Sequence, residues 1–145
     1  MGIKTINFEE LEIFIDGASR GNPGEAAGAA VIFDQSGAVI GEAGKYLGKA
    51  TNNVAEYNAL IVGLNEAAVL GGKVLKIFSD SELLVKQWNG IYRIKKPELQ
   101  RLSIQARNLA VKFEKVSLRH VYREDNKEAD KLANQVLNKK KSINL

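Results

Sequence analysis

The order of elements along the chain predicts an α/β fold with a mixed five-stranded sheet flanked by helices. Three runs rich in β-branched and aromatic residues come first, and later strands alternate with helical segments. Opening hairpins require antiparallel strand pairing, whereas helical crossovers require parallel pairing with right-handed connections. A length of 145 residues fits one domain over residues 1–145.

The first third of the chain predicts a three-stranded antiparallel meander. Residues 11–15 alternate in polarity and predict a strand that ends at Asp16. The glycine, asparagine and proline residues of segment 17–24 then predict a tight irregular loop. Residues 27–33 and 39–46 predict two further strands joined by a hairpin turn.

Helices and strands alternate in the middle of the chain. Residues 54–70 lack proline and are rich in alanine and leucine, which predicts a long helix ended by two glycines. Residues 74–78 predict a short buried strand that runs into Asp80. Helical character follows over residues 83–88.

The last third predicts two helices around one strand. From Leu99, apolar residues recur at spacings of three and four, as in an amphipathic helix of about four turns. Residues 116–122 predict the last strand, and a final helix begins near Asn126. We expect a frayed tail over residues 139–145.

The composition restricts the chemistry that the chain can perform. Without cysteine there are no disulfides, thiolate zinc sites or cysteine nucleophiles, and one histidine excludes a multi-histidine metal site. Metal chemistry would therefore use carboxylates and a hard cation such as Mg²⁺ or Mn²⁺. The net charge of +4 is a mild bias toward polyanionic partners.

The sequence predicts a cytoplasmic protein. The N-terminal residues lack the pattern of a secretory signal, and no apolar stretch approaches the ~18 residues needed to cross a bilayer.

Four acidic residues occupy positions where carboxylates can converge. Asp16 and Asp80 follow strands that we expect to be parallel neighbours, and ligands bind at the carboxyl ends of such strands. Glu56 and Asp130 lie near the starts of two helices, where anions are favoured. Each acid alone also fits a turn or capping role. Two carboxylates about 5 Å apart repel by roughly 3 kcal/mol, so their convergence would require cations.

Four motifs resemble those of type 1 ribonuclease H. They are DGASRGNPG at residues 16–24, TNNVAE at 51–56, SDS at 79–81 and NKEAD at 126–130, in the order found in that family. The resemblance implies the RNase H-like fold and an endonuclease that hydrolyses the RNA strand of RNA/DNA hybrids, leaving 5′-phosphate and 3′-hydroxyl ends. It also implies two Mg²⁺ ions, with Mn²⁺ as a substitute, held by the catalytic residues Asp16, Glu56, Asp80 and Asp130.

The resemblance also implies substrate contacts and an RNA/DNA hybrid as partner. The residues concerned are Gly17, Asn22, Asn52, Asn53, Ser81 and Arg123, with Arg20 as a further candidate. Asn52 and Asn53 could equally cap the long helix, and each could take one of the two roles. We expect a monomer with no obligate protein partner and no membrane association.

The chain lacks a histidine that better-known family members carry in the loop before the last acid. Arg123 or Glu124 could occupy that space. The only histidine, His120, lies in the last predicted strand with the parity of Val116 and Leu118, which predicts a packed or partly buried side chain.

The basic helix and loop that many family members insert after the tryptophan-containing helix are also missing. Arg93, Lys95 and Lys96 would form a reduced substitute that contacts phosphates, or simply a solvated loop. The lysines at 139–141 would reach the DNA strand or act as a solubilising tail.

These departures leave two alternatives to the hybrid nuclease. One is a hybrid-binding module with weak catalysis, against which the presence of all four acids argues. The other is the same nuclease fold acting on duplex RNA.

Overall fold

One mixed sheet of six strands forms the centre of the computed structural model, which describes residues 9–144. The strands are β1 (Glu10–Gly21), β2 (Gly24–Phe33), β3 (Val39–Ala50), β4 (Val74–Ser79), β5 (Lys115–His120) and β6 (Ile143–Asn144), arranged in the order β5-β4-β1-β2-β3-β6. β1 pairs antiparallel with β2 and parallel with β4, which confirms the predicted mixture of pairings. β5 pairs parallel with β4, and β2, β3 and β6 pair antiparallel in turn.

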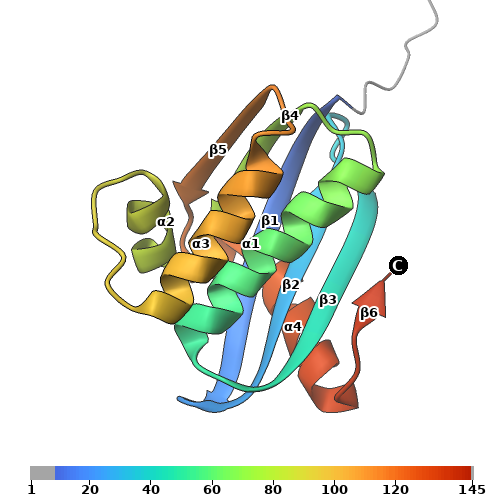
Figure 1. Ribbon diagram of the computed structural model, residues 1–145. Coiled ribbons are helices and arrows are strands. Elements are labelled where there is room, and N and C mark those ends of the chain that lie inside the picture. The colour runs from blue at the N-terminus through green and yellow to red at the C-terminus, as the bar shows by residue number, and fades with distance from the viewer. Residues whose placement is uncertain (1–8, 145) are drawn as a thin grey trace, which may run out of the picture.

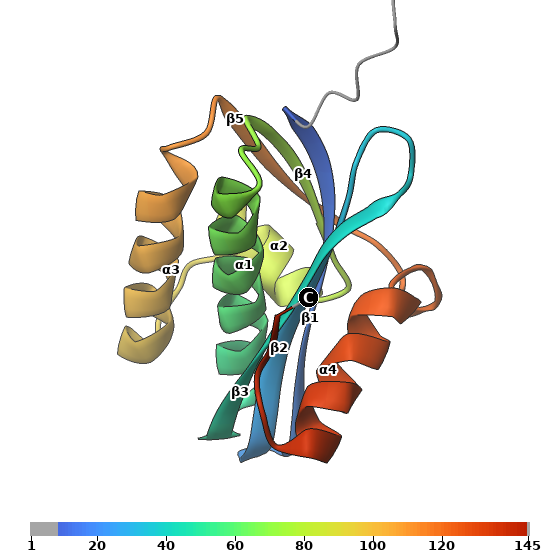
Figure 2. The ribbon, with the colours of Figure 1, turned by 90° about the vertical axis from the view of Figure 1, so that its right-hand side faces the viewer.

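Helices cover both faces of the sheet. They are α1 (Asn52–Val69), α2 (Glu82–Trp88), α3 (Pro97–Ala110) and α4 (Lys127–Lys139), with a 3₁₀ turn, η1 (Arg123–Asp125), before α4. Seen edge-on, α1 and α3 lie on one side of the sheet and α4 lies on the other (Figures 1 and 2). The predicted order of strands and helices is confirmed up to the end of α4.

Two apolar layers hold the helices to the sheet. The larger one joins α1, α2 and α3 to inward-facing strand residues such as Ile13 and Ile77, and it includes Leu60 and Leu64 of α1. On the opposite face, Leu132 of α4 packs with small and branched residues of β2. Since β2 contacts helices on both faces, seven of its ten residues are buried.

The first strand is longer than we predicted, and Asp16 lies in its middle rather than at its end. Antiparallel pairing with β2 continues to Gly21↔Gly24, so the irregular loop predicted over residues 17–24 shrinks to a tight turn. The positive φ of Gly21, 107°, suits glycine at that turn. Pairing with β4 ends much earlier, at Ile15↔Ser79.

Residues 143–144 form a sixth strand, so the predicted number of five strands is wrong. The predicted fraying of the tail is also wrong for these two residues. Lys140 adopts a left-handed conformation after α4 and turns the chain back toward the sheet. Ile143 then pairs with Gly44 of β3 and packs against the α4 layer. The partial burial of Ile143 against this layer favours its pairing with β3.

None of the helices within residues 9–144 is both long enough and apolar enough to cross a membrane. The N-terminal segment judged to lack a secretory signal lies largely outside the described residues.

We predict that Gly28→Ala destabilises the fold by about 2 kcal/mol or more because α1 leaves no room for a side chain. A Cβ on Gly28 would lie 2.6 Å from the backbone nitrogen of Ala59. Gly41→Ala is the matched control, since its Cβ would meet the flexible end of Leu70 at 3.1 Å. Urea unfolding would measure both, and equal losses would contradict the prediction.

Candidate metal centre and cleft

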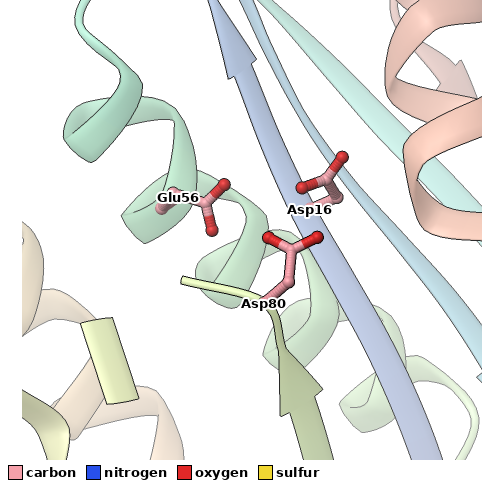
Figure 3. Close-up of side chains that lie close together, drawn as sticks. All are labelled: Asp16, Glu56 and Asp80. Atoms are coloured by element: carbon pink, nitrogen blue, oxygen red, sulfur yellow. The ribbon is translucent and has the colours of Figure 1, made fainter. Parts of the chain in front are cut away.

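Three carboxylates converge beside the end of β4. Asp16, Glu56 and Asp80 each offer an oxygen atom within 4.8 Å of the others (Figure 3). Asp16 comes from the middle of β1, Asp80 directly follows β4, and Glu56 comes from α1. Because β4 stops at Ser79 while β1 continues, the side of β1 next to Asp16 is left open for the other two acids.

Gly17 allows α1 to approach β1 closely enough to place Glu56. A Cβ at Gly17 would lie 2.3 Å from the backbone nitrogen of Glu56, so a side chain cannot be accommodated there. The Gly17 N–H donates a 2.8 Å hydrogen bond to Glu56 Oε1, and Ser79 Oγ donates to Glu56 Oε2 at 3.4 Å. Gly17, predicted as a substrate contact, therefore also builds the acidic cluster.

The electrostatics of the cluster favour a bound cation. Burial, together with the charges of Asp80 and Asp130 and against the opposing effect of Arg123, raises the pKa of Asp16 to about 8. Burial, followed by the charge of Asp16, also holds the pKa of Glu56 well above its ordinary value. Without a cation the cluster retains protons at neutral pH, whereas a divalent ion would neutralise the repulsion. The set of oxygen donors fits Mg²⁺ or Mn²⁺.

Asp130 approaches the cluster from the other face of the sheet. Its carboxyl makes a hydrogen bond with Asp16 and raises the pKa of that residue, although Asp130 itself is exposed. One helical turn later, Asn134 Nδ2 donates to the Asp130 backbone oxygen at 3.0 Å and to Oδ1 at 3.4 Å. Arg20 in turn donates to Asn138 Oδ1 at 2.7 Å and to Asn134 Oδ1 at 3.4 Å. The candidate substrate contact Arg20 thus also ties the end of β1 to α4.

A cleft of about 450 Å³ opens over the four acids. Besides these acids, its lining includes six of the predicted contact residues: Gly17, Arg20, Asn52, Asn53, Ser81 and Arg123. Five predicted residues, Asn22, Arg93, Lys95, Lys96 and Glu124, are not part of this lining. The structure therefore gathers candidate residues from all four motifs, together with Arg123, around one cavity.

Asn52 and Asn53, the first two residues of α1, are not needed to cap the helix. The Thr51 hydroxyl accepts a 3.2 Å hydrogen bond from Val54 N and is the side-chain cap of α1. Asn22 Oδ1 accepts from the backbone N–H of Asn52 at 3.1 Å, so the β1–β2 turn fastens the start of α1. Asn52 and Asn53 line the cleft.

Ser81 does have a capping role, because its hydroxyl accepts a hydrogen bond from Leu84 N at the start of α2. Arg93, Lys95 and Lys96 are exposed in the connection between α2 and α3. Glu124 is exposed in η1, whereas its neighbour Arg123 reaches the cleft.

His120 is exposed, so the predicted packed side chain is wrong. It is the last residue of β5, an edge strand, and the inward face of that strand ends at the buried Leu118. The imidazole instead packs edge-to-face against Tyr122, with ring centroids 5.6 Å apart.

Sequence reasoning missed three polar side chains that support the acids. Ser79 contacts Glu56, Asn134 contacts Asp130, and Asn126 Nδ2 donates to Asp80 Oδ2 at 3.3 Å. Ser79 and Asn126 lie inside the quoted motifs, so the motifs could have pointed to them as supporting residues. Asn134 has no motif and could have been found only as a polar residue one turn after Asp130.

Comparisons with known proteins agree on one family. A family model described as reverse transcriptase-like matches residues 14–136. Ribonuclease HI of Halobacterium salinarum is 43% identical over 127 residues, which are 88% of this chain and 64% of the relative. Four curated relatives match 88% of this chain, but the matches span between 35% and 64% of their own lengths.

Solved structures agree with the sequence comparison. The crystal structure of RNase H1 from the halophilic archaeon Halobacterium salinarum has a TM-score of 0.87 and 42% identity, covering 90% of this chain and 98% of its own. An RNase H1 in complex with an RNA/DNA hybrid has a TM-score of 0.85 and 35% identity, covering 89% of this chain and 97% of its own.

We predict that Asp16→Asn stabilises the metal-free protein at pH 8 by at least about 2 kcal/mol. A carboxyl whose pKa rises from 3.8 to about 8 on folding destabilises the fold progressively as pH rises between these values. The gain should therefore shrink toward pH 4, and chemical unfolding in EDTA across this range would measure it. A gain independent of pH would contradict the prediction.

Proposed function

The chain belongs to the type 1 ribonuclease H family, and on this premise we propose that it hydrolyses the RNA strand of RNA/DNA hybrids. The observation that carries this proposal is the convergence of Asp16, Glu56 and Asp80 at the base of the cleft, with Asp130 beside Asp16. The carboxylates are the catalytic residues, and the expected products carry 5′-phosphate and 3′-hydroxyl ends.

We propose that the four carboxylates hold two Mg²⁺ ions, for which Mn²⁺ can substitute. When bound, such ions activate the attacking water and stabilise the leaving 3′ oxygen. The chain contributes the geometry: Gly17 and Ser79 fix the two oxygens of Glu56, and Arg123 offsets part of the charge around Asp16. The raised pKa of Asp16 means that cation binding must displace a proton at neutral pH.

The cleft lining suits a hybrid with one RNA strand. The 2′-hydroxyls of RNA lie in a wide, shallow minor groove, where short amide side chains can contact them. Asn52 and Asn53 line the cleft and are not required as side-chain caps, so we assign them this contact. Ser81 and Gly17 lie on the same lining, next to Asp80 and Asp16.

Charged residues around the cleft would hold the phosphates. Arg123 lines the cleft from η1 and lowers the pKa of Asp16, so we assign to it, rather than to Glu124, the role of the missing histidine. We assign Arg93, Lys95 and Lys96 to backbone phosphates further along the hybrid, because all three are exposed in the connection that follows α2. The cytoplasmic location and the monomeric state stay predictions.

We predict that Asp80→Asn lowers the rate of hybrid cleavage by a factor on the order of 10² or more, because it removes one carboxylate ligand. Cleavage of a labelled RNA/DNA hybrid with Mg²⁺ or Mn²⁺ would measure it. Asp125→Asn is the matched control, since Asp125 is exposed in η1 and lies outside the cleft lining. Equal cleavage by wild type and Asp80→Asn would refute the assignment.

The same assay separates the alternatives. Hybrid binding by the wild type without turnover at any metal concentration would identify a binding module. Faster cleavage of duplex RNA than of hybrid, in competition with duplex DNA, would assign the site to another substrate.

We predict that the triple variant Arg93→Gln, Lys95→Gln and Lys96→Gln raises KM for the hybrid by about tenfold at low salt with little change in kcat. Each lost phosphate contact should also flatten the dependence of binding on salt concentration. The matched control is Lys73→Gln with Lys115→Gln, at the opposite end of β4 from Asp80. The same increase in KM in both variants would indicate a general effect of net charge.

A further inference from the structure

Asn126 is a fully buried amide at the junction between the acidic cluster and α4. Its Nδ2 donates two hydrogen bonds, one to the backbone oxygen of Ile15 at 2.9 Å and one to Asp80 Oδ2 at 3.3 Å. Ile15 immediately precedes Asp16. One side-chain group therefore contacts the backbone next to one acid of the cluster and the carboxylate of another.

The orientation of this amide is fixed by its partners. A backbone carbonyl can only accept a hydrogen bond, so the NH₂ group and not the oxygen of Asn126 must face Ile15 O. Among the buried side-chain nitrogen and oxygen atoms of residues 9–144, only Asn126 Oδ1 has no hydrogen-bond partner. The two hydrogen bonds donated by Nδ2 are therefore the only ones that hold the Asn126 side chain in place.

The two bonds lie where the sheet stops aligning the acids. Parallel pairing between β1 and β4 ends at Ile15↔Ser79, one residue before both Asp16 and Asp80. The Asn126 amide links Ile15 of this last pair to the side chain of Asp80, the residue that follows β4. It therefore ties the Asp80 carboxylate to β1 where strand pairing no longer does so.

The side chain of Asn126 is not used to cap α4. Asp130 N donates to the backbone oxygen of Asn126 at 3.2 Å, and no side-chain cap bond is formed at this helix start. A substitution of the side chain thus leaves the backbone hydrogen bond that begins α4, and with it the helix that carries Asp130.

We propose that Asn126 is a positioning residue that holds the Asp80 carboxylate in register with Asp16 for binding a divalent cation. The proposal rests on the proposed function, because it concerns the cation that this function requires. Groups that hydrogen-bond to metal ligands orient them, and their loss typically weakens metal binding by tenfold to a hundredfold.

Asn89 offers a matched control within the same chain. Its Nδ2 also donates two hydrogen bonds, to the backbone oxygens of Val85 and Leu118, each at 3.0 Å. Asn89 therefore ties a helix to a strand much as Asn126 does, but contacts no carboxylate through these bonds. Asn89→Ala reports what the loss of a structural amide does by itself.

The experiment measures Mn²⁺ binding to the full chain by electron paramagnetic resonance, in wild type, Asn126→Ala, Asn126→Ser and Asn89→Ala. We expect Asn126→Ala to raise the Mn²⁺ dissociation constant about tenfold or more, with a smaller increase for Asn126→Ser, whose hydroxyl keeps one donor. Asn89→Ala should stay within about twofold of wild type. If Asn126→Ala does not fold, Asn126→Ser provides the comparison.

Cleavage of the hybrid is the second readout. We expect the Mn²⁺ concentration for half-maximal activity of Asn126→Ala to rise with its dissociation constant, while KM for the hybrid at saturating Mn²⁺ stays within about threefold. An unchanged Mn²⁺ affinity in both Asn126 variants, or an equal loss in Asn89→Ala, would overturn the proposal.

The two proposals can fail separately. A wild-type protein that binds Mn²⁺ but does not cleave would refute the proposed function, while the dissociation constants would still decide the role of Asn126. A wild-type protein that binds no Mn²⁺ would refute both.

Discussion

The site depends on the unequal lengths of two neighbouring strands. β4 ends at Ser79, whereas β1 continues to Gly21 and is paired beyond Ile15 only with β2. The edge of β1 beside Asp16 is thus free of a neighbouring strand at the one place where helices from both faces can reach it. Glu56 arrives from α1 and Asp130 from α4, so acids from both helical layers and from the sheet meet in one cleft.

Placing these acids together conflicts with the stability of the fold. Burial and mutual repulsion raise the pKa values of Asp16 and Glu56, which means that their charged forms are unfavourable in the metal-free protein. Hydrogen bonds from Gly17 N and Ser79 Oγ offset part of this cost at Glu56. A divalent cation bound to the folded site would relieve the remaining repulsion between the charged forms, and its binding would then stabilise the fold.

The sequence predicted the elements and the acids better than it predicted their contacts. The four motifs were enough to single out Asp16, Glu56, Asp80 and Asp130, because each of these acids lies within a short local sequence pattern. That Asp16 lies in mid-strand could not be foreseen, because the glycines after it are typical of loops and only pairing with β2 keeps them extended. The bond from Asn126 to Ile15 joins residues 111 positions apart, a separation at which no local pattern carries information. The burial of His120 was predicted wrongly because alternation with Val116 and Leu118 indicates which face of the strand a residue is on, but not where the strand ends.

The site is divided between two separate apolar layers. Asp16, Glu56 and Asp80 belong to β1, α1 and the end of β4, which share the larger apolar core. α4 instead packs on the other face through separate, smaller apolar clusters, and after it Ser142 and the two residues of β6 attach the chain to β3. Detachment of α4 would remove Asp130 and Asn126 together and leave a three-acid platform, so completion of the site is coupled to the docking of one helix.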